Sequence, residues 1–218
     1  MFKRHIALAT AAAALGLASV AHADTIDGGG KQAGSIIVDV RATDVIPDSG
    51  SSIQTPNGVD TGLTTHVSDS IVPTLGISYF FTDHIAAELV LGTSYHEISA
   101  VGGPTNVLVH KTWVLPPILS AQYHFAPKSD ISPYVGVGAN YMIFYSGRDD
   151  NGFTVKLRDG FGVSIEGGVD VALNKRTYLN LDVKKVFFET KATINGGALN
   201  SSVHLDPWVP SLGIGFRF

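Results

Sequence analysis

One group of residues in this chain has side chains that could support catalysis or metal binding. It consists of histidines with serines and an aspartate nearby in the sequence: His66, His96, His110, His204, Ser68, Ser94 and Asp69. Nucleophilic catalysis needs a base within hydrogen-bond reach of the nucleophile, and a zinc site needs ligands at a recurring spacing. These residues are scattered over polar stretches and follow neither pattern. The sequence therefore predicts no catalytic residue, no metal site and no cofactor, and so no enzyme.

A second group consists of charged residues that alternate with apolar ones: Glu88, Glu166, Asp170, Asp182, Lys184 and Arg217. In GFGVSIEGGVDVAL, for example, Glu166 and Asp170 share one face with small residues, while the other face is apolar. A carboxylate among apolar residues is costly unless a cation pairs with it. We therefore expect the elements that carry these residues to bring them together as a polar plug. The alternative is a charged lining that merely hydrates an open lumen.

The elements that must position these residues are β-strands, because apolar residues recur at every second position. Eight segments show this alternation, near residues 34–43, 71–81, 85–97, 112–125, 133–146, 160–173, 177–190 and 206–218. Each has about the ten-residue length that a tilted strand needs to cross a membrane. Short connections alternate with long polar ones. The sequence thus predicts an all-β fold, an eight-stranded antiparallel transmembrane up-and-down β-barrel.

Bulk composition separates this prediction from a soluble barrel or sandwich. Only 16% of the residues are charged, the mean hydropathy is +0.21, and there is no cysteine. A soluble sheet carries polar and charged residues on its solvated face, whereas the face opposite the apolar one here is rich in Gly, Ser and Ala. Small side chains suit the narrow lumen of a small barrel. Aromatic residues also fall near the predicted strand ends, as they do at membrane interfaces.

The first residues, MFKRHIALATAAAALGLASVAHA, combine Lys3 and Arg4, a short apolar run and an Ala-His-Ala cleavage site. This pattern is typical of a secretory signal peptide, so residues 1–23 are expected to be removed and residues 24–218 to form one barrel. The long connections, about 44–70, 98–111, 147–159 and 191–205, should then be four extracellular loops. The expected location is the cell outer membrane of a Gram-negative bacterium, in contact with lipid and lipopolysaccharide. The formal net charge of −4 gives no indication of a nucleic-acid partner.

The inward positions above the predicted plug are apolar, unlike those below. They are Val72, Val114, Pro116, Ile118, Met142, Phe144, Val186, Phe188 and Val209. An apolar lining inside a barrel favours a hydrophobic ligand over water. We therefore expect a hydrophobic channel that opens to the cell exterior. The alternative is that these side chains only pack against one another and against the loops.

Several prolines lie inside the predicted strands, namely Pro73, Pro116, Pro117, Pro207 and Pro210. Proline cannot donate a hydrogen bond to the sheet and is normally confined to edges or bulges, and a closed barrel has no edge. These positions therefore predict a gap in the wall, through which an apolar solute would leave sideways into the lipid. Bulges that only bend the strands are the alternative.

Several motifs of this chain resemble those of the OmpW family of small outer-membrane barrels. AGSIIVDVRAT looks like the first strand of that family, and PTLGISYFFTDHIAAELVLGTSYHEI like its second hairpin. LPPILSAQYHF followed by PYVGVGANY is similar to the central motifs, and LDPWVPSLGIGFRF to the ending. The resemblance covers nearly all of residues 24–218. One departure is Pro210, where an ordinary apolar residue is expected.

The resemblance implies an eight-stranded barrel with a narrow channel for small hydrophobic molecules, which in some relatives serves alkane or aromatic uptake. The terminal Phe218 also resembles the signal by which the barrel assembly machinery recognises its substrates, so that machinery is an expected partner of the C-terminal strand. The predicted function is therefore an outer-membrane, porin-like channel for small hydrophobic solutes. The alternative is a non-transporting barrel that acts as an adhesin, a stress-related surface protein, or a phage or bacteriocin receptor.

Overall fold

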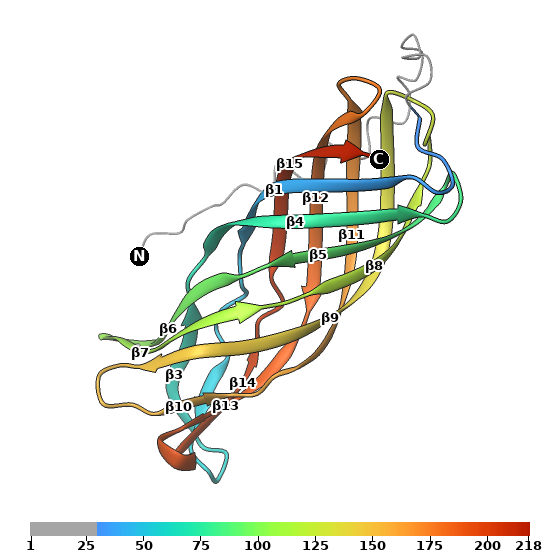
Figure 1. Ribbon diagram of the computed structural model, residues 1–218. Coiled ribbons are helices and arrows are strands. Elements are labelled where there is room, and N and C mark those ends of the chain that lie inside the picture. Colours follow the sequence, from blue (N-terminus) through green and yellow to red (C-terminus); the bar gives the residue numbers. More distant parts are fainter. Residues whose placement is uncertain (1–29) are drawn as a thin grey trace.

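The computed structural model describes residues 30–218, which fold almost entirely into β-strands (Figure 1). The predicted signal peptide, residues 1–23, lies outside the described residues. Among the residues that are described, no helix has the length and apolar character needed to cross a bilayer. A short 3-10 helix, η2, spans Asn195–Gly197.

Eight strands pair side by side into a closed antiparallel barrel, which confirms the predicted fold class. They are β1 (Ile36–Val45), β4 (Ser70–Phe80), β5 (Ile85–Gly92), β8 (Ile118–His124), β9 (Ile131–Asp149), β11 (Gly160–Ala172), β12 (Thr177–Phe187) and β15 (Trp208–Arg217). Strand β1 pairs with both β4 and β15, for example Val40 with Leu75 and with Ile214. This double pairing closes the barrel, and Figure 1 shows the resulting ring of strands.

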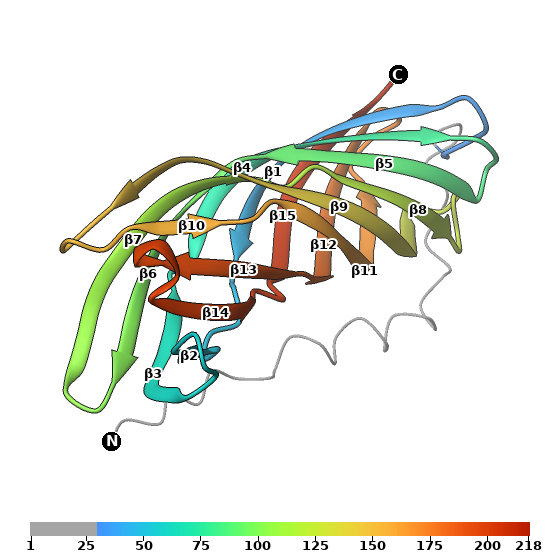
Figure 2. The same ribbon diagram turned by 90° about the horizontal axis from the view of Figure 1, so that it is seen from below.

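The four segments expected to be extracellular loops contain further strands, which corrects the loop boundaries. These strands are β2 (Ser52–Gln54), β3 (Asp60–Val67), β6 (Ser94–Gly102), β7 (Thr105–Leu115), β10 (Val155–Leu157), β13 (Glu189–Ile194) and β14 (Leu199–His204). Together with the upper part of β9 they form a second sheet, the collar, in the order β10-β13-β14-β2-β3-β6-β7-β9 (Figure 2). The many Thr and Ser residues of these strands did not distinguish strand from loop, since both residue types fit a solvated sheet as well as a loop.

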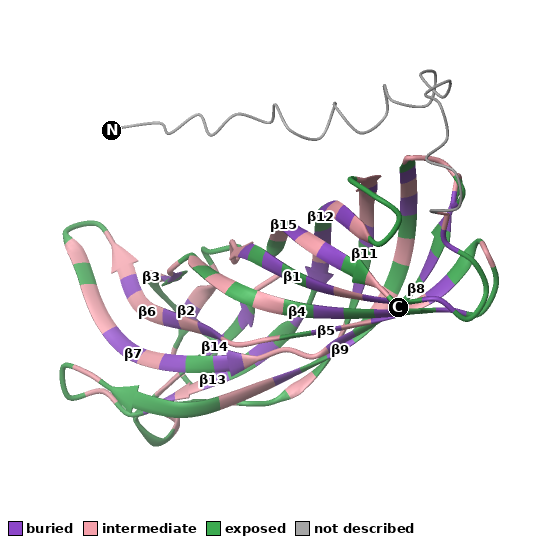
Figure 3. Ribbon diagram, turned by 45° about the horizontal axis from the view of Figure 1, so that its top comes forward, coloured by how far each residue is buried: buried purple, intermediate pink, exposed green. Residues whose placement is uncertain are grey.

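Burial alternates along the barrel strands (Figure 3), and the exposed positions carry apolar side chains. Val137, Val163 and Leu212 are 63%, 60% and 50% exposed, while the inward Asn140 and Asn180 are each 2% exposed. A soluble barrel would have the opposite arrangement, because its apolar face would fill the core. The exposed apolar band therefore faces lipid.

Aromatic side chains mark both borders of this band. Next to the short turns, Tyr79 packs edge-on against Phe81 and Tyr123 against Phe125. At the opposite border Trp113 stacks with Tyr145 and packs at a tilt against Tyr95, and Tyr141 packs against Phe161. Two such girdles define the membrane interfaces of outer-membrane barrels. Tyr95 and Trp113 lie at the barrel ends of β6 and β7, so the collar begins at the second girdle, on the side of the long connections.

Gly136 in β9 is needed because Glu166 of β11 occupies the space where a side chain would be. A Cβ added there would lie 2.4 Å from Glu166 Oε1 and 2.9 Å from Cδ. We expect Gly136→Ala to displace this buried carboxylate and lower the free energy of unfolding by about 1–3 kcal/mol, the usual cost of overpacking. Urea titration of the barrel in lipid vesicles measures this change.

The matched control is Gly167→Ala on the lipid-facing side of β11. Its added Cβ would meet only Tyr134 O, at 3.9 Å. The explanation would be wrong if both substitutions changed the stability equally.

Candidate functional site

The centre of the barrel holds a network of buried charges, the plug. Lys184 of β12 is its hub, since its Nζ lies 2.9 Å from Glu88 Oε2 and 3.0 Å from Asp182 Oδ1 and also pairs with Glu166. Alternation places each of these side chains inward, and strands β5, β11 and β12 carry them to one height. All four residues are less than a tenth exposed.

Arg41 of β1 joins the plug from the wall between β12 and β5. Its Nη2 lies 3.0 Å from Asp39 Oδ2 and also donates to Glu88 Oε1. Glu88 therefore connects both cations, with one oxygen for Arg41 and the other for Lys184. Such a fully paired network is the arrangement in which buried charges are tolerated.

A second layer of polar contacts lies below the plug, next to the short turns. Lys31, which precedes the first strand, is fully buried there and pairs with Asp170. Its Nζ also lies 3.0 Å from His124 Nδ1 and donates to Ser132 Oγ at 3.1 Å. Asn180 Nδ2 donates to Asp170 Oδ1 at 2.7 Å and completes the layer. The two layers fill the lower half of the lumen with polar side chains.

Of the residues predicted for the plug, the structure brings Glu88, Glu166, Asp182 and Lys184 into one network, and Asp170 into the layer beneath. Arg217 is a correction. Its Nη2 donates to Lys175 O at 2.9 Å and its Nη1 to Gly30 O, so it ties the N-terminal segment to a short turn. Its place at the very end of β15 puts it below the plug, out of reach of Glu88 and Glu166.

The cations missing from the prediction are Arg41 and Lys31. The run IIVDVRAT carried a usable signal, because alternation places Asp39 and Arg41 on the same inward face. Lys31 lies before the first alternating segment, so no periodic pattern marked it. Its position depends on how the N-terminal segment folds into the mouth of the barrel, where Lys31 N–H donates to Pro127 O at 2.8 Å.

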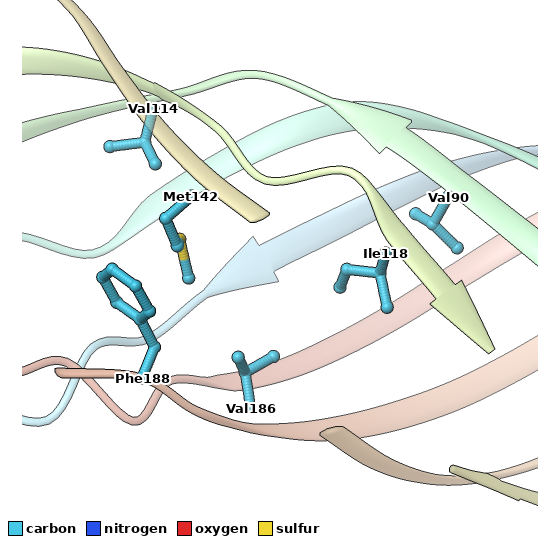
Figure 4. Packing of buried hydrophobic residues seen from close by; sticks show 6 residues of the cluster. All are labelled: Val90, Val114, Ile118, Met142, Val186 and Phe188. Carbon is cyan, nitrogen blue, oxygen red and sulfur yellow. The ribbon is translucent and has the colours of Figure 1, made fainter. Parts of the chain in front are cut away.

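Above the plug the lumen becomes apolar and encloses a cavity of about 100 Å³, the vestibule. Six buried side chains form its core, namely Val90, Val114, Ile118, Met142, Val186 and Phe188 (Figure 4). Figure 4 shows them extending into a common space from different strands. Phe144 and Val209 pack against this core.

Most of the residues predicted to line the channel meet here. Val72, Val114, Pro116, Ile118, Met142, Phe144, Val186 and Val209 line the cavity, and Phe188 belongs to the same cluster. Val90 completes the cluster but was not predicted. Its strand alternates regularly, so the sequence indicates that Val90 points inward. The sequence does not indicate how high in the barrel Val90 lies.

A second apolar cluster lies at the collar end of the vestibule, where four of its five residues line the same cavity, and nothing in the sequence predicted it. Ile53, Ala100, Val109, Val155 and Ile194 form it, and they come from all four long connections. Asp149 helps to hold these connections together, since its Oδ1 lies 2.9 Å from His110 Nδ1 and accepts the Val155 N–H at 2.9 Å. The hydrogen bond from the Val155 backbone holds the pKa of Asp149 below its usual value, and His110 adds to this effect.

The histidines considered for chemistry are spread over four strands of the collar. His96 Nε2 lies 2.8 Å from Ser94 Oγ in the same strand, β6, and its Nδ1 lies 2.7 Å from Ser68 O, between β3 and β4. His204 Nε2 lies 3.4 Å from Glu189 Oε2 on the exposed collar. Within residues 30–218, no group of three or more His, Cys, Asp or Glu side chains is arranged to hold a metal ion.

The wall around the vestibule contains a stretch without regular pairing. Pairing of β5 with β8 ends at Val90 and Ile118, and pairing of β6 with β7 begins at Ser94 and Val114. Pro116 and Pro117 lie between these two blocks and have no N–H to donate. The predicted strand at 112–125 is therefore two strands, β7 and β8. We call this stretch the seam.

On the other side of this segment, pairing of β4 with β5 ends at Thr74 and Gly92, next to Pro73. Gly92 therefore has a partner in β4 but none in β8, and Thr93 has no regular sheet partner on either side. Both residues line the vestibule. Thr93 is held instead by its side chain, whose Oγ1 donates to Val114 O at 3.2 Å and lies 2.5 Å from Tyr145 Oη.

The other prolines each keep a contact to one neighbouring strand. Pro73 is in register with Ala42 of β1, and Pro210 with Val183 of β12. Pro207 contributes its carbonyl, which accepts the Val186 N–H at 3.1 Å. Pro116 and Pro117 differ in that they lie between two separate paired blocks, so we take their surroundings as the candidate for the predicted gap.

Comparison with known proteins agrees with this architecture. A sequence profile described as OmpW family matches residues 32–218. Outer membrane protein W of Vibrio cholerae is 32% identical over 86% of this chain and 90% of its own length. An uncharacterized outer-membrane protein, y4mB of Sinorhizobium fredii, is 40% identical over 82% of this chain and 78% of its own.

Solved structures show the same fold. OprG from Pseudomonas aeruginosa superposes with a TM-score of 0.82 at 30% identity, covering 88% of this chain and 99% of its own. AlkL in lipid bilayers superposes with a TM-score of 0.68 at 22% identity, covering 87% of this chain and 92% of its own, which is a likeness of fold.

Proposed function

Because the chain belongs to the OmpW family of outer-membrane proteins, we propose that it is a channel that carries small hydrophobic molecules from the cell exterior into the membrane. The solute enters the vestibule, is stopped by the plug, and leaves sideways through the seam. Lipid of the Gram-negative outer membrane surrounds the apolar outer face and receives the solute.

The observation that carries this proposal is an apolar cavity directly above a fully paired network of charges. An empty apolar cavity excludes water and accepts an apolar guest, as cavities of about 150 Å³ do for benzene. The vestibule, at about 100 Å³, is suited to a guest of the same order of size. A non-transporting adhesin or receptor has no need for such a cavity and would be as stable with a filled lumen.

The seam supports sideways exit. A solute in the vestibule that continued downward would have to displace Arg41, Lys184 and their carboxylates, which are costly to separate. At the seam, by contrast, no ladder of hydrogen bonds between β5 and β8 has to be broken. The path of lowest cost therefore leads between Gly92 and Pro116 into the surrounding lipid.

Uptake measurements with variants of the vestibule test the proposal. Met142→Asp and Phe188→Asp each place a carboxylate in the apolar core of the cavity. Because an unpaired buried carboxylate attracts water and opposes an apolar guest, uptake of labelled naphthalene by cells should fall about tenfold.

Met142→Leu is the matched control and should keep uptake near that of the parent, since volume and polarity are preserved. Surface amounts of each variant are compared by gel mobility of the folded barrel. Unchanged uptake in both Asp variants, at normal surface amounts, would rule out the vestibule as the route.

A further inference from the structure

The plug and the layer beneath it contain more acidic than basic side chains. In the described part of the lower lumen, five buried carboxyl groups face three buried cations: Asp39, Glu88, Glu166, Asp170 and Asp182 against Lys31, Arg41 and Lys184. Each of these residues is less than a tenth exposed. If all of them were ionised, the lower lumen would carry a surplus of two negative charges.

The other titratable groups of the lower lumen do not offset this surplus. His124 Nδ1 accepts from Lys31 Nζ at 3.0 Å, and His124 Nε2 donates to the Gln122 side-chain carbonyl at 3.2 Å, so the ring carries one proton and is neutral. Tyr134 can only add negative charge if it ionises. Arg217 lies at the mouth, where two backbone carbonyls bind its guanidinium.

Water has too little room to solvate two unpaired charges. A cavity of about 10 Å³ lies in the lower lumen, and Asp39, Glu88 and Asp170 are among the residues that border it. That volume holds about one water molecule. An ionised carboxylate without a counter-charge is so costly in such surroundings that the group normally takes up a proton instead.

The hydrogen bonds divide the five carboxyl groups into two kinds. In three of them, both oxygens accept hydrogen bonds and at least one donor is a lysine or an arginine: Glu88, Glu166 and Asp170. Hydrogen bonds and cations at both oxygens favour the ionised form of a carboxyl group. These three groups are therefore suited to remain charged.

Asp39 and Asp182 are supplied with fewer donors. Asp39 Oδ2 accepts from Arg41 Nη2 at 3.0 Å, a donor shared with Glu88, and no hydrogen bond to Asp39 Oδ1 is recorded within residues 30–218. Asp182 Oδ1 is buried and has no hydrogen-bond partner in the same part of the chain, although Lys184 Nζ lies 3.0 Å away. The carboxyl groups that keep one oxygen without a hydrogen bond are thus equal in number to the surplus charges.

We propose that the lower lumen binds two protons, one on Asp39 and one on Asp182, which makes its three carboxylates and three cations electrically neutral. The contact of 2.9 Å between Tyr134 Oη and Asp182 Oδ2 suits both forms of the aspartate, because a hydroxyl can donate or accept. This inference does not depend on solute transport. It makes the plug sensitive to pH, since the loss of either proton leaves an uncompensated buried charge.

Infrared spectroscopy of the full chain counts these protons directly. Protonated carboxyl groups absorb in a spectral region that ionised carboxylates leave empty, and exposed Asp and Glu side chains are ionised at neutral pH. In micelles of an ester-free detergent, two such bands are expected. Asp39→Asn and Asp182→Asn should each remove one band, because asparagine keeps the shape of the neutral acid. The control Asp60→Asn, at an exposed position of β3, should leave both.

Stability measured against pH gives a second readout. The unfolded chain releases an aspartate proton at about pH 4, whereas the folded barrel keeps it, so the folded state binds more protons and loses stability as the pH rises. Between about pH 5 and pH 7, the unfolding equilibrium constant of the parent, divided by that of Asp182→Asn, should increase about tenfold per pH unit. Asp60→Asn should follow the parent. Urea titration in lipid vesicles gives these constants.

Two infrared results would overturn the proposal. A parent spectrum without bands of protonated carboxyl groups would show that the surplus is offset in another way, such as by a bound cation. Bands that remain in both Asp39→Asn and Asp182→Asn would show that other groups hold the protons. An equal pH dependence of the parent and Asp182→Asn would contradict the proposal as well. Each of these outcomes leaves the proposed channel function untouched, because solute uptake is measured separately.

Discussion

Lys184→Met is expected to prevent most of the protein from reaching a stable folded barrel. Lys184 Nζ is the shared partner of Glu88, Glu166 and Asp182, so its loss leaves these carboxylates with Arg41 as the nearest cation. Removing one partner from a buried ion pair usually costs about 3–5 kcal/mol, which is a large part of the total stability of a domain. Urea unfolding in lipid vesicles and the gel mobility of unheated samples both report the loss.

The adjacent Lys185 provides a matched control. It lies on the outer face of the same strand, with its Nζ 5.1 Å from the centre of the Trp208 ring. Lys185→Met removes the same charge without exposing a buried carboxylate, so the change in unfolding free energy should be within about 1 kcal/mol. Equal effects of the two substitutions would show that Lys184 does not hold the plug together.

A compensating substitution separates electrostatics from packing. Glu166→Gln added to Lys184→Met removes one of the stranded charges and keeps the shape of the side chain. Gln122 Nε2, which donates to Glu166 Oε1 at 2.8 Å, can still find an acceptor there. The double variant should therefore recover part of the lost stability, as coupled residues do in double-mutant cycles.

A disulfide across the seam is expected to reduce uptake to the level of cells that lack the protein. The pairs Val90–Ile118 and Ser94–Val114 share one register, so Thr93 and Leu115 lie opposite each other between them. Opposite residues of antiparallel strands are close enough for a disulfide. The chain contains no cysteine, so Thr93→Cys with Leu115→Cys introduces a single possible bridge.

Oxidation and reduction then switch the same molecule between a bridged and an unbridged seam. Oxidation ties Thr93, between β5 and β6, to the end of β7 at the proposed exit, and reduction should restore uptake of labelled naphthalene. The control bridge, Val163→Cys with Phe187→Cys, joins β11 to β12 at positions that are already paired. Uptake should not respond to oxidation there. If oxidised Thr93–Leu115 cells take up solute as fast as reduced cells, the exit lies elsewhere.

The sequence alone determined the architecture of the barrel. Alternation assigned the eight strands and the face of each residue, because a strand fixes side-chain direction with a period of two. That was enough to place Glu88, Glu166, Asp182 and Lys184 in the lumen and Val137 or Leu212 against lipid. It was also enough to indicate an apolar upper lumen, since Met142, Phe144, Val186 and Phe188 share inward faces. The family motifs supported the same fold.

Only the tertiary structure decided the heights and partners of these residues. The stagger between neighbouring strands sets which inward side chains meet, and no local pattern encodes it. This is why Arg41, rather than Arg217, pairs with Glu88, and why Lys31 was missed. The collar was missed for another reason, because the Thr and Ser residues of its strands fit a solvated sheet as well as a loop.

The prolines illustrate the same division between what the sequence determined and what the tertiary structure decided. Their positions in the sequence marked where a donor is missing from a strand. Whether pairing is lost there depends on the register of the neighbouring strands. That register leaves Pro73 and Pro210 with a partner on one side each and leaves Pro116 and Pro117 between two separate blocks. The residue types and their alternation therefore determined which side chains form the wall. The register between neighbouring strands of the closed sheet decided where the wall lacks pairing.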